Sequence, residues 1–149
     1  MEMNILSGGQ LRMKKHVFIP AARPDEDIDL PISCFLIRHS QGNVLFDTGC
    51  HPTAVTNARD HWGYMAEYVV PTMGKKENVV DALGDIGLGT DDIDLVVNSH
   101  LHMDHCGCNE FFKKATMIVH EAELARVRDP KVEGRGYFKS DWDTGNEFD

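Results

Sequence analysis

The chain has 149 residues, of which 42% are hydrophobic, and a formal net charge of −9 at pH 7. This length and composition predict one domain with a hydrophobic core and exclude a disordered chain. The acidic balance argues against a nucleic-acid-binding protein, because phosphate groups are bound by clustered Lys and Arg, and none of the basic residues forms such a patch.

The N-terminus and the cysteines bear on the compartment. Residues 1–10 lack the apolar core of a signal peptide, and the chain has no apolar run of about 18 residues that could span a membrane. The cysteines at positions 34, 50, 106 and 108 form no C-x-x-C pair. We therefore expect reduced thiols in a cytoplasmic protein, with Cys106 as a small buried residue rather than a metal ligand.

The N-terminal third predicts strands. Residues 6–20 predict an edge strand, a turn at Gly8-Gly9 and a second short strand over 17–19, and the charged residues 23–29 predict a loop. The apolar run 34–38 and the run 44–46, separated by a turn, predict a hairpin. Because these strands show little polar alternation, they predict burial on both faces of the sheet.

Residues 51–74 form a long segment of mixed character. Its large apolar side chains either line a pocket or pack a lid or short helix onto the core: Trp62, Tyr64, Met65, Tyr68 and Met73. His51 and His61 also lie in this segment, outside any metal-ligand spacing, so we expect them to be exposed or structural.

The second half of the chain alternates helices and strands. Helices are predicted over 77–86 and 120–127 and from Met103 to Phe112, and strands over 93–97 and 116–119. The order strand, strand, helix, strand predicts a mixed α/β fold. A helix beginning at Met103 would place its N-terminus beside Asp104, a position that favours an anion. After Asp129 the apolar pattern does not resume.

The segment from Ser99 to Gly107 reads H-x-H-x-D-H and directly follows a predicted strand. Imidazole nitrogens and carboxylate oxygens suit zinc better than iron, manganese or cobalt. His100 and His102 alternate along an extended segment, so both rings point the same way, and Asp104 and His105 can face a second ion. A solvated polar loop is the alternative, but three histidines and one aspartate within six residues favour a metal site.

The H-x-H-x-D-H motif resembles the metal motif of the metallo-β-lactamase superfamily. Residues 30–37 and 44–52, including Asp47-Thr48-Gly49, look like the N-terminal half of the N-acyl-homoserine lactonase family. Residues 93–107 also resemble 4-pyridoxolactonase, a relative in the same superfamily. The resemblance extends from about Leu6 to about Asp129.

This resemblance implies an α/β (α+β) fold, the metallo-β-lactamase αβ/βα sandwich, of which residues 1–149 form only the N-terminal half. It implies that Asp47, otherwise a candidate ligand or catalytic carboxylate, mainly supports the loops at the metal site. The family places a further histidine, a bridging aspartate and a last histidine after this point, and no matching stretch precedes Asp149. We therefore expect a domain incomplete at its C-terminus, as a fragment or one part of a split protein.

The implied function is a dinuclear zinc hydrolase that opens a lactone ring, most specifically a quorum-quenching N-acyl-homoserine lactonase. His100 and His102 would hold the first zinc ion, and Asp104 and His105 the second, with Asp104 also handling the proton. The expected partners are a small-molecule lactone and a second copy or complementing chain, with no nucleic acid or membrane. The alternatives are another hydrolase of the superfamily, such as a 4-pyridoxolactonase, thioester hydrolase or β-lactamase-like enzyme, and a non-catalytic fragment or partner module.

Overall fold

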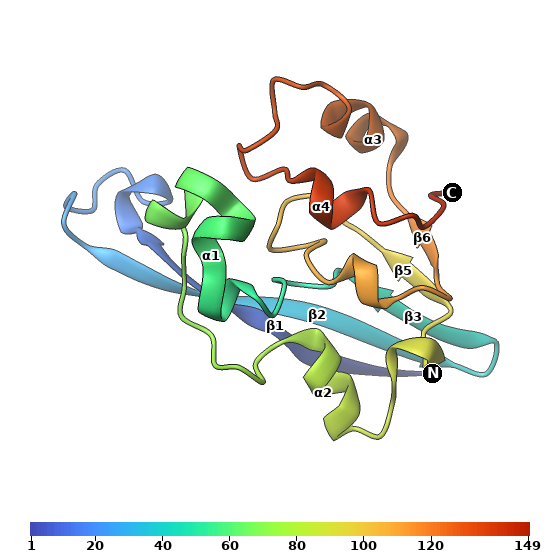
Figure 1. Cartoon of the computed structure of the whole chain (residues 1–149). Coiled ribbons are helices and arrows are strands. Elements are labelled where there is room, and N and C mark those ends of the chain that lie inside the picture. Colours follow the sequence, from blue (N-terminus) through green and yellow to red (C-terminus); the bar gives the residue numbers. More distant parts are fainter.

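A computed structural model describes residues 1–149 and contains one six-stranded sheet with the order β4-β1-β2-β3-β5-β6 (Figure 1). The strands are β1 (Glu2–Lys14), β2 (Asp27–His39), β3 (Gly42–Phe46), β4 (Val70–Pro71), β5 (Leu95–Val97) and β6 (Thr116–Ile118). Strands β1, β2 and β3 pair antiparallel, whereas β5 and β6 run parallel to β3. The predicted mixed α/β fold is confirmed.

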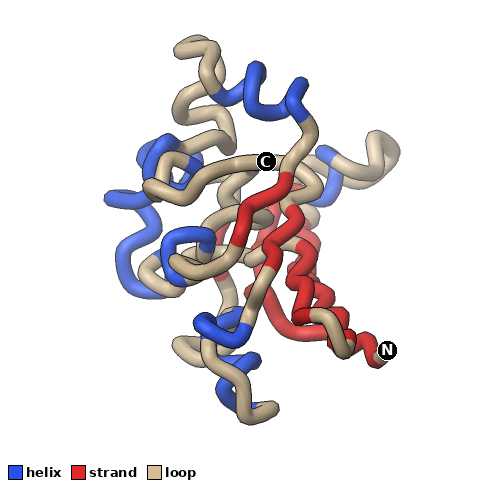
Figure 2. The backbone as a smooth tube through the Cα atoms, turned by 90° about the vertical axis from the view of Figure 1, so that its right-hand side faces the viewer, coloured by secondary structure: helices blue, strands red, loops and turns tan.

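The helices are short, and most of them lie to one side of the sheet (Figure 2). They are α1 (Ala54–Trp62), α2 (Val79–Asp85), α3 (Glu121–Val127) and α4 (Lys139–Trp142). Helix α2 begins two residues later than predicted, where the Asn78 side chain caps it by accepting a hydrogen bond from the Asp81 amide at 3.0 Å. None of the helices is long and apolar enough to cross a membrane.

The main core lies between the sheet and the helices. Alternate strand residues point toward this side and are almost fully buried: Leu6, Cys34, Leu36, Leu45, Val96 and Met117. They pack against Val79 and Leu83 of α2 and against Phe112. Burial of each such aliphatic side chain contributes about 2 kcal/mol to folding. The period of two along the strands therefore fixes which face of the sheet carries the helices.

The opposite face of the sheet is apolar but partly exposed. Its side chains form two cross-strand rows, Ile5-Phe35-Phe46-Val97-Ile118 and Met3-Ile37-Val44-Leu95. Ile5 is 67% exposed, Met3 62% and Phe46 37%. The strands are apolar on both faces, as their lack of polar alternation indicated. The prediction that both faces are buried is wrong for this chain, because no helix or second sheet packs on these two rows.

The structure corrects the prediction for the N-terminal strands. Strand β1 is one continuous strand with a bulge between Ser7 and Gly9, and in place of the second strand the chain forms a short 3-10 helix, Lys15–Val17, followed by an exposed turn. Strand β2 begins earlier than predicted, since Asp27 and Asp29 form ion pairs across the ladder to Lys14 and Arg12 at 2.7 Å each. Charges that indicated a loop therefore extend the hairpin at its end.

Two C-terminal predictions are also wrong. No α-helix begins at Met103; the loop after β5 turns back on itself, and only Asn109–Phe111 form a short 3-10 turn. The Thr48 and Asn98 side chains donate hydrogen bonds to the His105 carbonyl, which a helix would use for its own backbone bonds. Helix α4 was not predicted, because its four residues are too few to show a helical period. The predicted anion-binding helix N-terminus at Asp104 is therefore absent.

Candidate metal centre

The H-x-H-x-D-H loop follows the end of β5, and a buried network of hydrogen bonds stabilises its backbone. The His105 carbonyl accepts a hydrogen bond from the Thr48 amide at 2.7 Å. The Thr48 hydroxyl and the Asn98 amide group also reach this carbonyl, at 3.3 Å each. Asn109 is fully buried and bonds to both Thr48 and Asn98. The loop backbone thus has its polar groups satisfied without helical structure.

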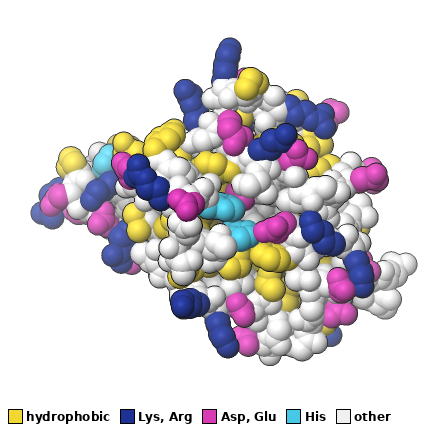
Figure 3. Space-filling model, in the orientation of Figure 1, with side chains coloured by type: hydrophobic (Ala, Val, Ile, Leu, Met, Phe, Trp, Pro, Cys, Tyr) yellow, Lys and Arg dark blue, Asp and Glu magenta, His cyan; other side chains and the backbone are white.

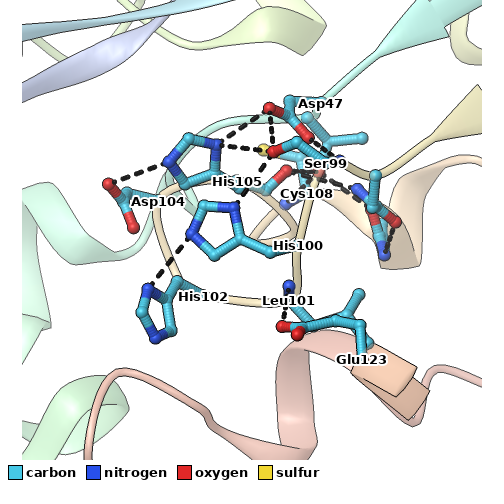
Figure 4. A network of polar contacts seen from close by, with 12 residues as sticks. Asp47, Ser99, His100, Leu101, His102, Asp104, His105, Cys108 and Glu123 are labelled. Atoms are coloured by element: carbon cyan, nitrogen blue, oxygen red, sulfur yellow. Dashed lines mark hydrogen bonds and ion pairs between the residues drawn. The ribbon is translucent and has the colours of Figure 1, made fainter. Parts of the chain in front are cut away.

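The four predicted ligands lie in two pairs (Figure 4). His100 Nε2 and His102 Nδ1 are 3.1 Å apart, and His105 Nε2 and Asp104 Oδ2 are 3.4 Å apart. The His100 ring lies between the other two, with centroids 4.7 Å from His102 and 4.0 Å from His105. No group of three or more His, Cys, Asp or Glu side chains is arranged to hold one ion.

Asp47 and Ser99 orient two of the histidines from the sheet side. Asp47 Oδ2 lies 2.8 Å from His105 Nδ1, and the same carboxylate accepts bonds from the Ser99 amide at 2.7 Å and hydroxyl at 2.8 Å. Ser99 Oγ is 3.0 Å from His100 Nδ1. Both rings therefore have Nδ1 occupied and Nε2 directed into the site, which is how metal-binding histidines are usually supported.

The backbone at Asp47 is also specialised for this role. Its φ is +59°, the only positive φ at a residue other than glycine in the chain. This left-handed conformation is tolerated mainly by Gly, Asn and Asp. It turns the chain at the end of β3 so that the carboxylate, only 5% exposed, points at Ser99 and His105.

The donor sets fit a zinc ion in chemistry and spacing. Two donors about 2.0 Å from one tetrahedral zinc ion lie about 3.3 Å apart, close to the separation observed in both pairs. All four donors are nitrogen or carboxylate oxygen, and His100, His102, Asp104 and His105 are each only half-buried, so an ion can reach them. On the face drawn in Figure 3, Lys and Arg side chains are interspersed with Asp and Glu.

The pKa values of the histidines differ between the two ligand pairs. Burial lowers the pKa of His100 and of His102, and the neighbouring imidazoles lower both further. Burial opposes the charged form of His105 too, but bonds to Asp104 and Asp47 outweigh it and raise the pKa to about 9. Burial likewise acts to raise the pKa of Asp104, yet the hydrogen bond with His105 holds it below its ordinary value. Asp104 is therefore ionised at neutral pH.

Cys106, Trp62 and Met73 are buried and have structural roles. Cys106 is fully buried, and burial raises its pKa well above the usual range. Trp62 and Met73 of the 51–74 segment are buried in a second core cluster. Met65 packs against the same cluster, whereas Tyr64 and Tyr68 are exposed and meet edge to face with ring centroids 6.4 Å apart.

The histidines outside the motif are also bonded within the protein. His51 Nε2 lies 2.6 Å from Glu110 Oε1, and His61 Nε2 lies 2.6 Å from Asp141 Oδ1. The two imidazoles stack with centroids 4.8 Å apart. They are structural, as expected.

Sequence reasoning missed the residues that approach His102 from the C-terminal part of the chain. These are Glu123, Gly136 and Tyr137. No pattern near them marks a site. Gly134 and Gly136 are typical of a turn, but the sequence does not indicate which segment such a turn would contact.

The chain matches one protein-family model over most of its length. The family described as the metallo-beta-lactamase superfamily matches residues 27–145, which include the whole H-x-H-x-D-H loop. The chain belongs to this superfamily.

Its relatives include lactonases. The N-acyl homoserine lactonase AiiB of Agrobacterium fabrum is 39% identical over 132 residues, covering 81% of this chain and 47% of the relative. The N-acyl homoserine lactonase AttM of the same organism is 33% identical over 140 residues, covering 93% of this chain and 53% of the relative. The chain thus spans about half the length of the curated relatives it matches.

Solved structures agree on the fold. An N-acyl homoserine lactone hydrolase with N-hexanoyl-L-homoserine at its catalytic metal centre matches 99% of this chain and 58% of its own, with a TM-score of 0.84 and 25% identity. AidC, a dizinc quorum-quenching lactonase, matches 85% of this chain and 44% of its own with a TM-score of 0.62 and 19% identity, a likeness of fold. The predicted metallo-β-lactamase fold is confirmed for the N-terminal half of such proteins, and the fold implies a metal.

Proposed function

We propose that this chain supplies the first ligands of a zinc-dependent lactone hydrolase whose substrates are N-acyl-homoserine lactones. The observation that carries the proposal is the pairing of four donors, with His100 and His105 oriented through Ser99 and Asp47. The names of the relatives AiiB and AttM support the lactone as substrate class.

In this proposal His100 and His102 hold one zinc ion, and Asp104 and His105 hold the second. Bound zinc ions polarise a carbonyl group and lower the pKa of water, which is the chemistry that lactone hydrolysis needs. The chain itself orients the donors: Asp47 fixes His105, and Ser99 fixes His100. Asp104 is ionised and partly exposed, so its Oδ2 can accept a proton at the site as well as bind an ion.

Each pair requires a further donor. Catalytic zinc sites normally have three protein ligands and a water, whereas each pair here has two. We propose that the missing donors come from a second layer that packs on the exposed apolar rows led by Ile5 and Met3. Further residues of the protein, a second copy or a complementing chain could each provide that layer, and residues 1–149 would then be one half of a sandwich domain.

A second candidate function is a non-catalytic partner module. The absence of any convergent set of three donors favours it for the 149-residue chain on its own. Under this alternative the chain binds its partner through the apolar rows and contributes no chemistry alone.

The metal content of the purified chain, without added metal or chelator, is the first test. About two zinc ions per chain are expected if the donor pairs are completed in solution, and hydrolysis of acyl-homoserine lactones of several chain lengths is then measured beside 4-pyridoxolactone. Turnover of 4-pyridoxolactone alone would contradict the proposed substrate class. Little or no zinc, with no turnover, would favour the partner module.

His102→Ala separates the two candidates further. The hydrolase proposal predicts loss of zinc and activity, whereas the module proposal predicts little change in binding to the partner. His120→Ala is the matched control, because His120 only caps α3 by accepting a bond from the Ala122 amide at 3.1 Å. It should cost about 1 kcal/mol of stability and leave the zinc content unchanged.

A further inference from the structure

His102 is held by contacts from the C-terminal part of the chain that no sequence motif marks. The residues before and after it are both fixed through their backbone amides. The Leu101 amide donates to Glu123 Oε1 at 2.9 Å, as Figure 4 shows, and the Met103 amide donates to the Gly136 carbonyl at 2.9 Å. The peptide that follows His102 and the amide of the residue before it are thus both bonded to other segments, which restricts the His102 backbone.

The His102 side chain is confined by the same segment. The Tyr137 ring meets the imidazole at a centroid distance of 4.3 Å and an interplanar angle of 60°. A Cβ at Gly136 would lie 3.2 Å from His102 Cδ2 and 3.4 Å from Nε2, closer than ordinary van der Waals contact. A side chain at this position would therefore require the imidazole to shift by a few tenths of an ångström.

The confining segment is itself well anchored. The turn is closed by a hydrogen bond from the Gly134 amide to the Tyr137 carbonyl at 2.9 Å. Leu101 is fully buried in a small core with Val127 of α3, and Tyr137 packs against this core. Burial and the nearby Glu123 carboxylate raise the pKa of Tyr137, so its hydroxyl stays neutral at physiological pH.

We propose that Glu123, Gly136 and Tyr137, here called the His102 frame, are positioning residues for metal binding. The frame holds His102 Nδ1 at the spacing from His100 Nε2 that one ion needs. This inference rests on the proposed function, because it assigns the frame to the ligand pair named there. It goes beyond that function by assigning residues outside the ligand motif that set zinc affinity without touching the ion.

Two glycines of the same turn give a matched test. Gly136 and Gly134 both have positive φ, +90° and +78°, so alanine strains the backbone similarly at either position. They differ in what the new Cβ meets: the His102 ring at Gly136, but only Tyr64 Cε1, at 3.8 Å, at Gly134. Zinc affinity of the 149-residue chain, titrated with zinc alone, should fall about tenfold in Gly136→Ala and change less than about twofold in Gly134→Ala.

Glu123 gives an independent test through hydrogen exchange. In Glu123→Ala the Leu101 amide loses its acceptor, so its exchange should accelerate at least about tenfold and zinc affinity should fall about tenfold. Glu123→Gln keeps an oxygen acceptor of the same shape and should restore both. A merely structural role for Glu123 would change global stability without this selective rescue.

The outcomes separate failure of the frame from failure of the function. Equal zinc affinities in Gly136→Ala and Gly134→Ala, with Leu101 exchange unchanged in Glu123→Ala, would overturn the frame and leave the ligand pairs standing. No zinc uptake by the unmodified chain at millimolar zinc would overturn the ligand pairs themselves. Loss of affinity in Gly136→Ala alone supports both.

Discussion

His105 and His102 belong to the same loop, yet different parts of the molecule hold them in different ways. His105 is fixed by a charged side chain, through the 2.8 Å contact with the buried Asp47 carboxylate. His102 is fixed by shape, through bonds to its neighbouring amides and contact with Tyr137 and Gly136. One ligand pair should therefore respond mainly to loss of charge, and the other mainly to a change in volume.

The largest effect is expected at Asp47. Asp47→Ala leaves Ser99 and His105 without their acceptor and places alanine at a φ of +59°, so the free energy of unfolding should fall by about 4 kcal/mol at pH 7. Urea denaturation measures this loss. Asp47→Asn is the control, because Asn tolerates the same φ and can still accept from the Ser99 amide. A loss below about 1 kcal/mol in Asp47→Ala would contradict the charged support.

The next effect concerns the network beneath His105. Asn109→Ala removes the donor to Asn98 Oδ1 and leaves the Thr48 hydroxyl only its longer bond to the His105 carbonyl, so it should cost about 2 kcal/mol. NMR shifts of the His105 ring should change more than those of His102. Asn57→Ala, on an exposed residue of α1, is the control and should have little effect. Equal shifts in both rings would show that the two histidines are not separately supported.

A third substitution should affect neither support. His61 bonds to the buried Asp141, and this hydrogen bond raises the pKa of His61 despite its burial. A raised folded-state pKa adds stability that is fully present below the unfolded value of about 6.5 and is lost as pH rises through the folded pKa. Asp141→Asn should therefore cost about 2 kcal/mol at pH 5.5, less at pH 9, and leave zinc affinity unchanged. Unfolding curves at both pH values test this, and a change in zinc affinity would show that Asp141 also acts on the ligand loop.

The smallest effect on stability is expected on the exposed apolar rows. Ile5 is 67% exposed, so Ile5→Thr should change the free energy of unfolding by less than about 0.5 kcal/mol. It should instead weaken self-association, measured by sedimentation, if the rows bind a second layer. Leu36→Ala, on the buried face, is the contrasting variant and should cost about 3 kcal/mol.

The same contrast explains what could be predicted from sequence. The hairpin, α2, α3 and the pairing of ligands follow from local patterns, such as the spacing of residues 79, 80 and 83 or the order His-x-His-x-Asp-His. The supporting role of Asp47 was implied by a family motif. The His102 frame was not predictable, because Glu123 and Gly136 reach the loop through contacts set by tertiary packing.

The helix predicted from Met103 is absent for a similar reason. Side-chain hydrogen bonds from Asn98 and Thr48 to the His105 carbonyl stabilise a tighter turn there instead. These bonds belong to a buried network that includes Asn109, eleven residues along the chain from Asn98, and this network overrides the local helix propensity.

The row that contains Val97 and Ile118 ends beside the ligand loop, because Asn98 and Ser99 directly follow β5. Under the proposed function, whatever covers that row also delivers the remaining donors. Covering the sheet and binding zinc are then thermodynamically coupled, and the coupling is reciprocal: zinc must tighten the second layer by the same factor by which that layer tightens zinc. A chelator would therefore act as a dissociating agent, and the assembled protein would respond to the supply of metal in its surroundings.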